Sequence, residues 1–205
     1  MNSAASLAVG LPVGRLSARC LVLAAYVLPA VAVWTVVGVA LMALTTVLPL
    51  AGVALVLAAI YGCCYGVAEV AGLGRFVVPG RRWQVPQSML IDASPWRRVL
   101  VWGAILGPGF ATRNPYAGFG LLPIAVAAMA ASNPLAAVAL AAAIGLAHGG
   151  ARAAVLLRDI TGEVVPQDAA GQLELLLRTV YWRRLDGVVL LAVAATATAA
   201  AVSYF

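Results

Sequence analysis

The sequence predicts an all-α fold, a polytopic bundle of transmembrane helices, and two observations carry this prediction. Of the 205 residues, 64% are hydrophobic, and the mean hydropathy is +1.02. A water-soluble fold of this composition would have too few polar residues to cover its surface. A span through the hydrocarbon of a bilayer needs about 20 mostly apolar residues. Apolar stretches without any charged residue occupy most of the chain, and three of the four are long enough for a span: 20–68, 99–112, 114–151 and 187–205.

The boundaries of the expected elements follow from the Pro, Gly and polar residues between these stretches. Pro49 and Gly52 predict a tight turn between the first two spans, and Ser132-Asn133-Pro134 predicts another turn before a later span. An amphipathic helix is expected before the last span. In order, the expected elements are spans at 20–47 and 52–73, a polar loop at 75–98, a long apolar segment at 99–131, a span at 134–157, a polar stretch at 158–184 with a helix at 172–181, and a final span at 185–204.

The number of crossings depends on residues 99–131, which are long for one span and short for two. With one crossing, all Arg clusters fall on the same side of the membrane, and the connections on the other side carry no charge, as the positive-inside rule predicts. With two crossings, the Arg residues of 158–184 move to the other side. We expect five spans with the N-terminus in the cytoplasm, and six remain the alternative.

Several features recur in the same order along the chain and predict an internal duplication within a single transmembrane domain, 1–205. Val85-Pro86-Gln87 recurs as Val165-Pro166-Gln167, and Trp96-Arg97-Arg98 recurs as Trp182-Arg183-Arg184. The stretch Tyr65-Gly66-x-x-Glu69 corresponds to His148-Gly149-x-x-Arg152. The predicted repeats are approximately 15–98 and 99–184, followed by the final span 185–205.

A broken helix is expected near residues 107–117, where two Pro, several Gly and an Arg interrupt an apolar segment. Unwound backbone at membrane depth occurs only where protein or water covers it, and in transporters it binds ions or anionic groups. The candidate binding residues here are Arg113, Asn114 and Tyr116. The alternative is a short external turn, with Arg113 extending to the lipid head groups.

Glu69, His148 and Arg152 complete the candidate substrate-binding set, because ionisable groups near membrane depth are costly and tend to pair or to serve a pathway. Glu69 and Arg152 occupy matching positions in the two repeats, so the alternatives to a gate or ion-coupling role are a salt bridge that joins the repeats and an interfacial location for both residues. For His148, the only histidine, the alternative to a proton relay is a packing role.

The polar loops are candidates for binding a partner protein or a second copy of the chain. Their excess of Arg, with no Lys, is typical of cytoplasmic loops beside anionic lipid and not of a nucleic-acid surface. We expect a multi-pass protein of a bacterial inner membrane, without a cleaved signal peptide. The candidate loop residues are Gln84, Pro86, Gln87, Trp96, Arg97, Arg98, Trp182, Arg183 and Arg184.

Catalytic and cofactor motifs are absent from the sequence. It contains no nucleophile elbow, no phosphate-binding glycine loop and no Cys-x-x-Cys pair. We therefore expect no enzyme activity, no cofactor and no metal site. The three cysteines, Cys20, Cys63 and Cys64, are expected to be buried small hydrophobic residues.

The second repeat resembles the superfamily that joins the cytochrome c biogenesis and disulfide-electron-carrier membrane proteins to the lysine-exporter-like transporters. The resemblance rests on about 60 residues. Its motifs are Gly103-x-x-x-Gly107-x-x-x-x-Thr112-x-x-Pro115, Asn114-Pro115-x-Ala117, Gly120 to Pro123, and Gly145-x-x-His148-Gly149-x-x-Arg152.

The resemblance implies two repeats around broken helices and a role in transport or a derived accessory role. The electron carriers have a cysteine after the proline, where this chain has Tyr116, and no cysteine follows Cys64. The leading hypothesis is therefore a transporter-like protein that binds or moves a small solute between the two repeats. The alternatives are a non-catalytic subunit or anchor for a partner protein, and a thiol-redox protein related to cytochrome biogenesis.

Overall fold

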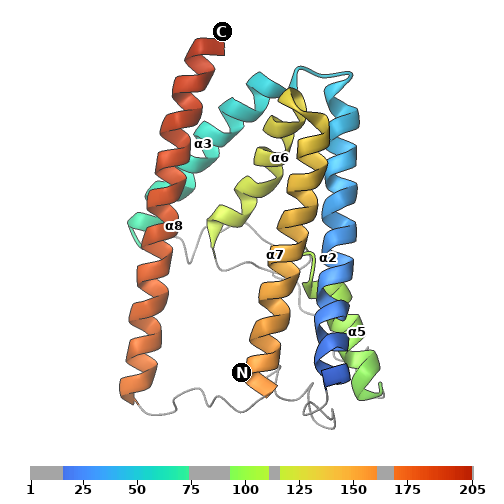
Figure 1. The fold of residues 1–205 in the computed structure, drawn as a ribbon. Coiled ribbons are helices and arrows are strands. Elements are labelled where there is room, and N and C mark those ends of the chain that lie inside the picture. The colour runs from blue at the N-terminus through green and yellow to red at the C-terminus, as the bar shows by residue number, and fades with distance from the viewer. Residues whose placement is uncertain (1–15, 74–92, 111–115, 161–168, 205) are drawn as a thin grey trace. The chain divides into compact units, whose positions relative to one another are not determined.

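The structure is a computed structural model, and it describes residues 16–73, 93–110, 116–160 and 169–204. Every regular element in these ranges is helical, which confirms the all-α prediction (Figure 1). The elements are α2 (Leu16–Thr45), α3 (Leu50–Val70), α5 (Pro95–Leu106), the 3₁₀ turn η2 (Ala117–Gly120), α6 (Leu121–Ser132), α7 (Pro134–Ile160) and α8 (Ala169–Tyr204).

Four helices of the described chain are long and apolar enough to cross a membrane: α2, α3, α7 and α8. Many of their large apolar side chains point away from the protein, among them Leu135 and Val202, which are 80% and 77% exposed. Exposed apolar side chains in such numbers fit a surface that contacts lipid. These four helices make the chain a membrane protein.

The long apolar segment at 99–131 contains two short helices, α5 and α6, of 12 residues each. Helix α5 begins with Pro95, and Ser94 accepts a hydrogen bond from the backbone N–H of Arg97. The helix ends at Leu106, because Pro108 has no N–H to continue it and Gly109 adopts a positive φ of 82°. The interruption therefore lies where the sequence predicts it.

The last helix differs from the prediction. Helix α8 runs without interruption over 36 residues, so the amphipathic segment at 172–181 and the final span form a single helix. The sequence between them, Tyr181 to Asp186, contains neither Gly nor Pro, and nothing in it ends a helix. The two segments differ in polarity but not in backbone conformation.

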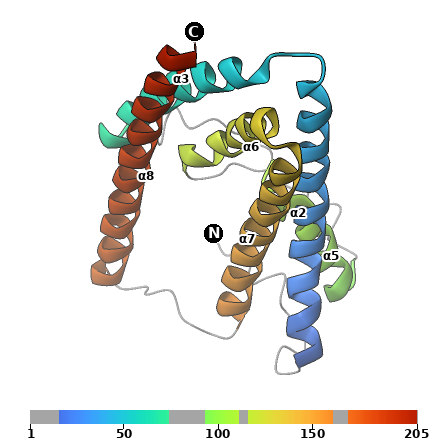
Figure 2. The same ribbon diagram turned by 45° about the horizontal axis from the view of Figure 1, so that its top comes forward.

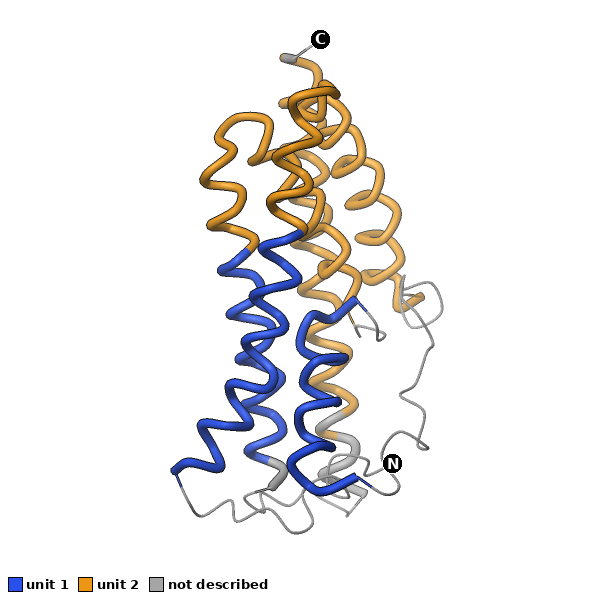
Figure 3. The backbone as a smooth tube through the Cα atoms, turned by 90° about the vertical axis from the view of Figure 1, so that its right-hand side faces the viewer, with its two compact units in different colours: residues 1–36, 80–113, 142–164 blue, residues 37–79, 114–141, 165–205 orange. Residues whose placement is uncertain are grey.

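The chain forms two compact units, and each draws on three separate parts of the sequence (Figure 3). Unit 1 contains residues 1–36, 80–113 and 142–164, and unit 2 contains residues 37–79, 114–141 and 165–205. The units interleave along the chain, so neither unit coincides with a predicted repeat. The duplication stays a prediction.

Unit 1 is built on the first half of α2, against which α5 and α7 pack. Its core includes Val22, Ala25 and Tyr26 of α2 together with Val99 of α5 and Ala153 of α7. Pro29 lies inside α2 and has no N–H, so the Ala25 carbonyl lacks its usual helical donor. Gly103 of α5 packs directly on that carbonyl, where any side chain would collide with it.

Unit 2 is built on α3 and α8, with η2 and α6 beside α3 (Figures 1 and 2). Small residues allow α3 and α8 to approach closely. A Cβ at Gly62 would lie 2.6 Å from the Leu190 carbonyl oxygen, and one at Gly187 would lie 2.9 Å from the Gly66 carbonyl oxygen. Such contacts between small residues are the usual way in which helices associate in a membrane.

Candidate functional site

The candidate site lies in unit 2, at the end of the apolar parts of α3 and α8. Glu69 is one residue from the end of α3, and Asp186 is the last charged residue of α8. The uncharged part of α8 from Gly187 to Tyr204 is about 27 Å long at 1.5 Å per residue, close to the hydrocarbon thickness of a bilayer. The two carboxylates therefore belong near the boundary between hydrocarbon and head groups.

The 3₁₀ turn η2 approaches these carboxylates through its backbone. The N–H of Gly118 donates a hydrogen bond to Oδ2 of Asp186 at 3.0 Å, and the N–H of Ala117 interacts with both Asp186 and Glu69. Gly118 allows this close approach, because a Cβ on this residue would collide with Oδ1 of Asp186 unless the Asp186 side chain moved. The turn thus presents consecutive backbone donors to an anionic pair, as unwound segments commonly do.

Tyr61 fixes the same turn from α3. Its hydroxyl donates a hydrogen bond of 2.7 Å to the Ala117 carbonyl oxygen, and its ring packs on Gly120. The ring of Tyr65, one helical turn further along α3, lies beside it with a centroid distance of 4.4 Å. Tyr61, Tyr65 and Glu69 follow one another at intervals of four residues, so they share one face of α3.

Glu69 is the most unusual group of the cluster. Its side chain is 1% exposed, and its closest opposite charge is Arg183, whose Nη1 lies 3.7 Å from Oε2. Apart from the Ala117 N–H, no hydrogen-bond donor lies against the Glu69 carboxylate oxygens within the described residues. A buried carboxylate with so few partners is costly to keep ionised.

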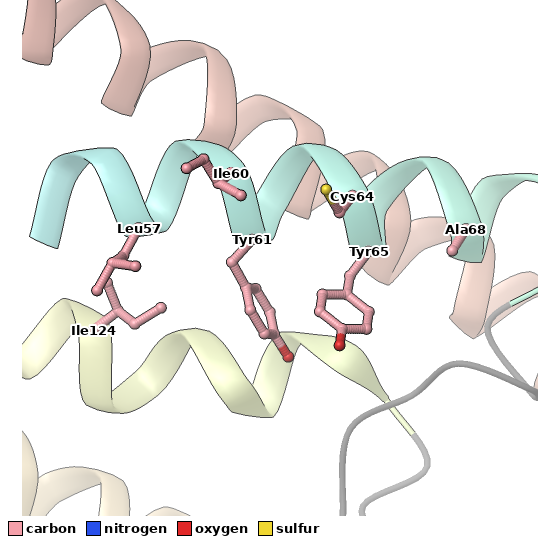
Figure 4. A pocket seen from close by; sticks show the side chains of 7 residues that line it. All are labelled: Leu57, Ile60, Tyr61, Cys64, Tyr65, Ala68 and Ile124. Carbon is pink, nitrogen blue, oxygen red and sulfur yellow. The ribbon is translucent and has the colours of Figure 1, made fainter.

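Three open pockets near this cluster are lined by described residues of unit 2. One, of about 520 Å³, lies along Tyr61, Tyr65 and Cys64 of α3, with Ile124 of α6 on its other side (Figure 4). In that view the hydroxyl groups of Tyr61 and Tyr65 point toward the start of α6. Asp186 contributes to the other two cavities, which measure about 420 and 620 Å³.

The two Asp186 cavities differ in chemistry. Aromatic side chains, Tyr116 and Trp182, line the smaller one together with Leu185 and Val189. The larger one is an apolar groove between α3, α6 and α8, with Thr196 among its lining residues. Asp186 therefore stands between an aromatic cavity and an apolar groove.

Of the predicted binding residues, the structure brings Glu69 and Tyr116 to this region of unit 2. His148 and Arg152 lie half-buried on α7 in unit 1, so the predicted Glu69–Arg152 pair stays a prediction. Arg113 and Asn114 lie outside the described residues.

The predicted loop residues that the structure describes are divided between unit 1 and unit 2. Trp96 packs on the core of unit 1, and Nε of Arg98 donates a hydrogen bond of 2.9 Å to the Ala93 carbonyl oxygen. Trp182 and Arg184 are exposed on α8, whereas Arg183 forms the ion pair with Glu69. Gln84, Pro86 and Gln87 lie outside the described residues.

Asp186, Tyr61 and Gly118 were not among the residues selected from the sequence. Asp186 carries a signal, because it is an acidic residue directly before an uncharged span, and Tyr61 carries another in its spacing from Glu69. Gly118 carries none, since its role depends on a hydrogen bond across 68 residues of sequence.

The prediction that the three cysteines are buried is wrong. Cys20, Cys63 and Cys64 are free and exposed on α2 and α3. Lipid tails are as apolar as a protein interior, so apolar surroundings in the sequence do not predict burial against protein.

Unit 1 has its own interaction at the interrupted helix. The indole N–H of the buried Trp34 donates a hydrogen bond of 3.1 Å to the Pro108 carbonyl oxygen, and the Trp34 ring packs against Phe110. This contact fixes the end of α5 to the middle of α2.

No family model matches this chain, and no curated protein and no solved structure shows significant similarity to it.

Proposed function

We propose that this chain is a small transporter-like protein of a bacterial inner membrane, and that it binds a small solute at the Asp186 cluster of unit 2. The observation that carries this proposal is the position of Asp186, which accepts a hydrogen bond from the N–H of Gly118 in the 3₁₀ turn before α6 and lines two pockets. Transporters commonly bind solutes where a helix is broken and backbone groups are free to make contacts.

The cluster is poorly suited to a purely structural role. A structural ion pair is most stabilising when its carboxylate oxygens are also satisfied by hydrogen bonds. Within the described residues, the buried Glu69 carboxylate has only the Ala117 N–H and a long ion pair to Arg183 as partners. This incomplete pairing supports a site at which a further group binds.

The proposed site is compatible with the sequence-based hypothesis of binding between two repeats, because α3 belongs to the first predicted repeat and η2 belongs to the second. The residues that support binding belong to one compact unit and come from α3, η2 and α8. We retain Tyr116 and Glu69 as candidate binding residues, and we add Asp186.

The predicted duplication is part of the proposal, and two glycine pairs support it. Gly62 and Gly66 of α3 contact α8, while Gly145 and Gly149, at the corresponding positions of the second repeat, contact α2. Each pair has a spacing of four residues and packs on the backbone of its partner helix. The resemblance to the lysine-exporter-like superfamily is part of the same proposal.

Reconstitution into liposomes tests transport. Purified protein is incorporated into proteoliposomes, and the uptake of radiolabelled choline, lysine, glycine and lactate is compared with uptake by protein-free liposomes. We expect at least one of these solutes to enter faster through the protein. Equal uptake of all four solutes by both kinds of liposome would contradict the proposal.

A second candidate function, an anchor for a partner protein, is favoured by the first part of α8. Leu176, Leu177 and Tyr181 are 63%, 62% and 63% exposed in a segment that precedes the uncharged span. Purification from a mild detergent tests this alternative, since an anchor would retain its partner in stoichiometric amount. A chain that purifies alone would argue against it.

A further inference from the structure

The smaller Asp186 cavity combines a carboxylate with aromatic rings. Tyr116 precedes η2, and Trp182 lies one helical turn before Asp186 on α8, so the same cavity is lined by the carboxylate and both aromatic side chains. Leu185 and Val189 complete its apolar lining. The volume of about 420 Å³ lies within the usual range for small-molecule sites.

The charge around this cavity favours a cation. Within the described residues the cluster holds two carboxylates, Glu69 and Asp186, and one guanidinium, Arg183. With both acids ionised, one negative charge is left over, and the backbone amides of Ala117 and Gly118 disperse it only in part. Within the described residues, the buried Glu69 carboxylate has only Arg183, at 3.7 Å, as an ion-pair partner.

The type of cation follows from the lining. A bare metal ion needs several oxygen, nitrogen or sulfur ligands, and the described part of the chain contains no group of three His, Cys, Asp or Glu residues that would hold one. An organic ammonium ion has different requirements. Its charge is spread over apolar substituents, which aromatic faces attract through the ring quadrupole, while a nearby carboxylate supplies the counter-charge.

We propose that the cavity between Tyr116, Trp182 and Asp186 binds the ammonium group of an organic cation. This inference names the class of solute for the proposed function. Transport of the cation rests on the proposed function, whereas binding of the cation does not. The carboxylate of Asp186 faces the ammonium group, and Trp182 and Tyr116 contact its alkyl substituents. The apolar groove on the other side of Asp186 has room for a longer apolar substituent.

Two sources supply this chemistry, a free solute such as choline and the head group of a choline lipid. Isothermal titration calorimetry of the full chain in a maltoside detergent, which carries no ammonium group, distinguishes them. Choline and the short lipid dihexanoylphosphatidylcholine are titrated separately. The uncharged isostere of choline, 3,3-dimethylbutan-1-ol, serves as the matched control for charge.

We expect choline or the short lipid to bind, and the uncharged isostere to bind at least tenfold more weakly. Tighter binding of choline identifies a free solute, and tighter binding of the lipid identifies a head group. Asp186→Asn and Trp182→Leu should each weaken binding by about tenfold, because cation–π and charged contacts are each worth about 1–2 kcal/mol when desolvated. Trp182→Phe, which keeps an aromatic face, should restore part of the loss.

Glu174→Gln serves as the control variant, since Glu174 is an exposed acid on the same helix. Equal binding of choline and its isostere, or an unchanged affinity in Asp186→Asn, would overturn the inference. If no ammonium compound binds but Asp186-dependent uptake of another solute is observed, the inference fails and the proposed function stands. If choline binds and no solute is transported, the inference stands and the proposed function fails.

Discussion

The backbone N–H of Gly118 and the carboxylate of Asp186 are joined by a hydrogen bond of 3.0 Å that connects the interrupted segment to the last helix. A hydrogen bond to a charged group contributes about 1.5–3 kcal/mol. Gly118 lies in η2, directly before α6, and Asp186 stands at the start of an uncharged span, so this contact joins the beginning of α6 to the beginning of that span.

Substitution of Asp186 tests the structural part of this relationship. Asp186→Ala removes the acceptor of the Gly118 N–H and should lower the free energy of unfolding by about 1.5–3 kcal/mol. Asp186→Asn keeps an acceptor oxygen and should lose less than half of that. Reversible unfolding in mixed detergent–SDS micelles measures both values. Equal stability of Asp186→Ala and the parent protein would show that the hydrogen bond contributes nothing.

Two neighbouring glycines of α7 provide a matched comparison for helix packing. A Cβ at Gly149 would lie 2.8 Å from the Tyr26 carbonyl oxygen, whereas a Cβ at Gly150 would meet nothing within 4 Å. Gly149→Ala should therefore destabilise the fold by about 1–3 kcal/mol, as overpacking does. Gly150→Ala should be neutral, or stabilising by up to about 1 kcal/mol, since Ala favours a helix.

The same unfolding measurement decides this comparison. Similar losses in both variants would mean that α7 does not approach α2 as closely as the structure shows.

The ion pair of Glu69 is tested by a double-mutant cycle. Glu69→Gln, Arg183→Gln and the double variant should show an interaction energy of about 0.5–3 kcal/mol, because each single change leaves a charge without its partner. A second double-mutant cycle combines Glu69→Gln with Arg152→Gln, because Arg152 is the partner of Glu69 expected from the predicted repeats. Strict additivity in the Glu69–Arg183 cycle would contradict the observed pair, and strong coupling to Arg152 would support the sequence-based prediction.

The orientation of the chain is tested at its C-terminus. Five crossings with a cytoplasmic N-terminus place Phe205 on the outer side, so alkaline phosphatase fused there should be active and green fluorescent protein should be dark. The reverse pattern would indicate six crossings. A fusion after Leu73, in the loop that carries the Arg residues, should give a fluorescent product in either case and serves as the control.

Much of the fold follows from hydropathy and from the positions of the Pro and Gly residues that end helices. The first two long helices end within three residues of their expected C-terminal limits, because Thr45 and Val70 stand beside turn-forming Pro and Gly residues. The interruption after Leu106 was expected from Pro108 and its glycines. The continuity of α8 was not, since a change from polar to apolar residues does not by itself end a helix.

The candidate site was only partly predictable, and the reason is physical. Glu69 was selected because a charge in an apolar helix is costly wherever the helix packs. Its partner Arg183 was placed in a loop, and the role of Gly118 depends on tertiary contacts that leave no local pattern. A sequence reveals which groups need partners more readily than it reveals which partners they find.

The most direct test of the account is the uptake of solutes into proteoliposomes that contain Asp186→Asn, measured beside the parent protein and Glu174→Gln. The account predicts that Asp186→Asn folds but transports the accepted solute about tenfold more slowly, since one lost contact to a charged group changes binding by at least that factor. Glu174→Gln should transport at the parental rate. Parental uptake by a correctly folded Asp186→Asn variant would contradict the account.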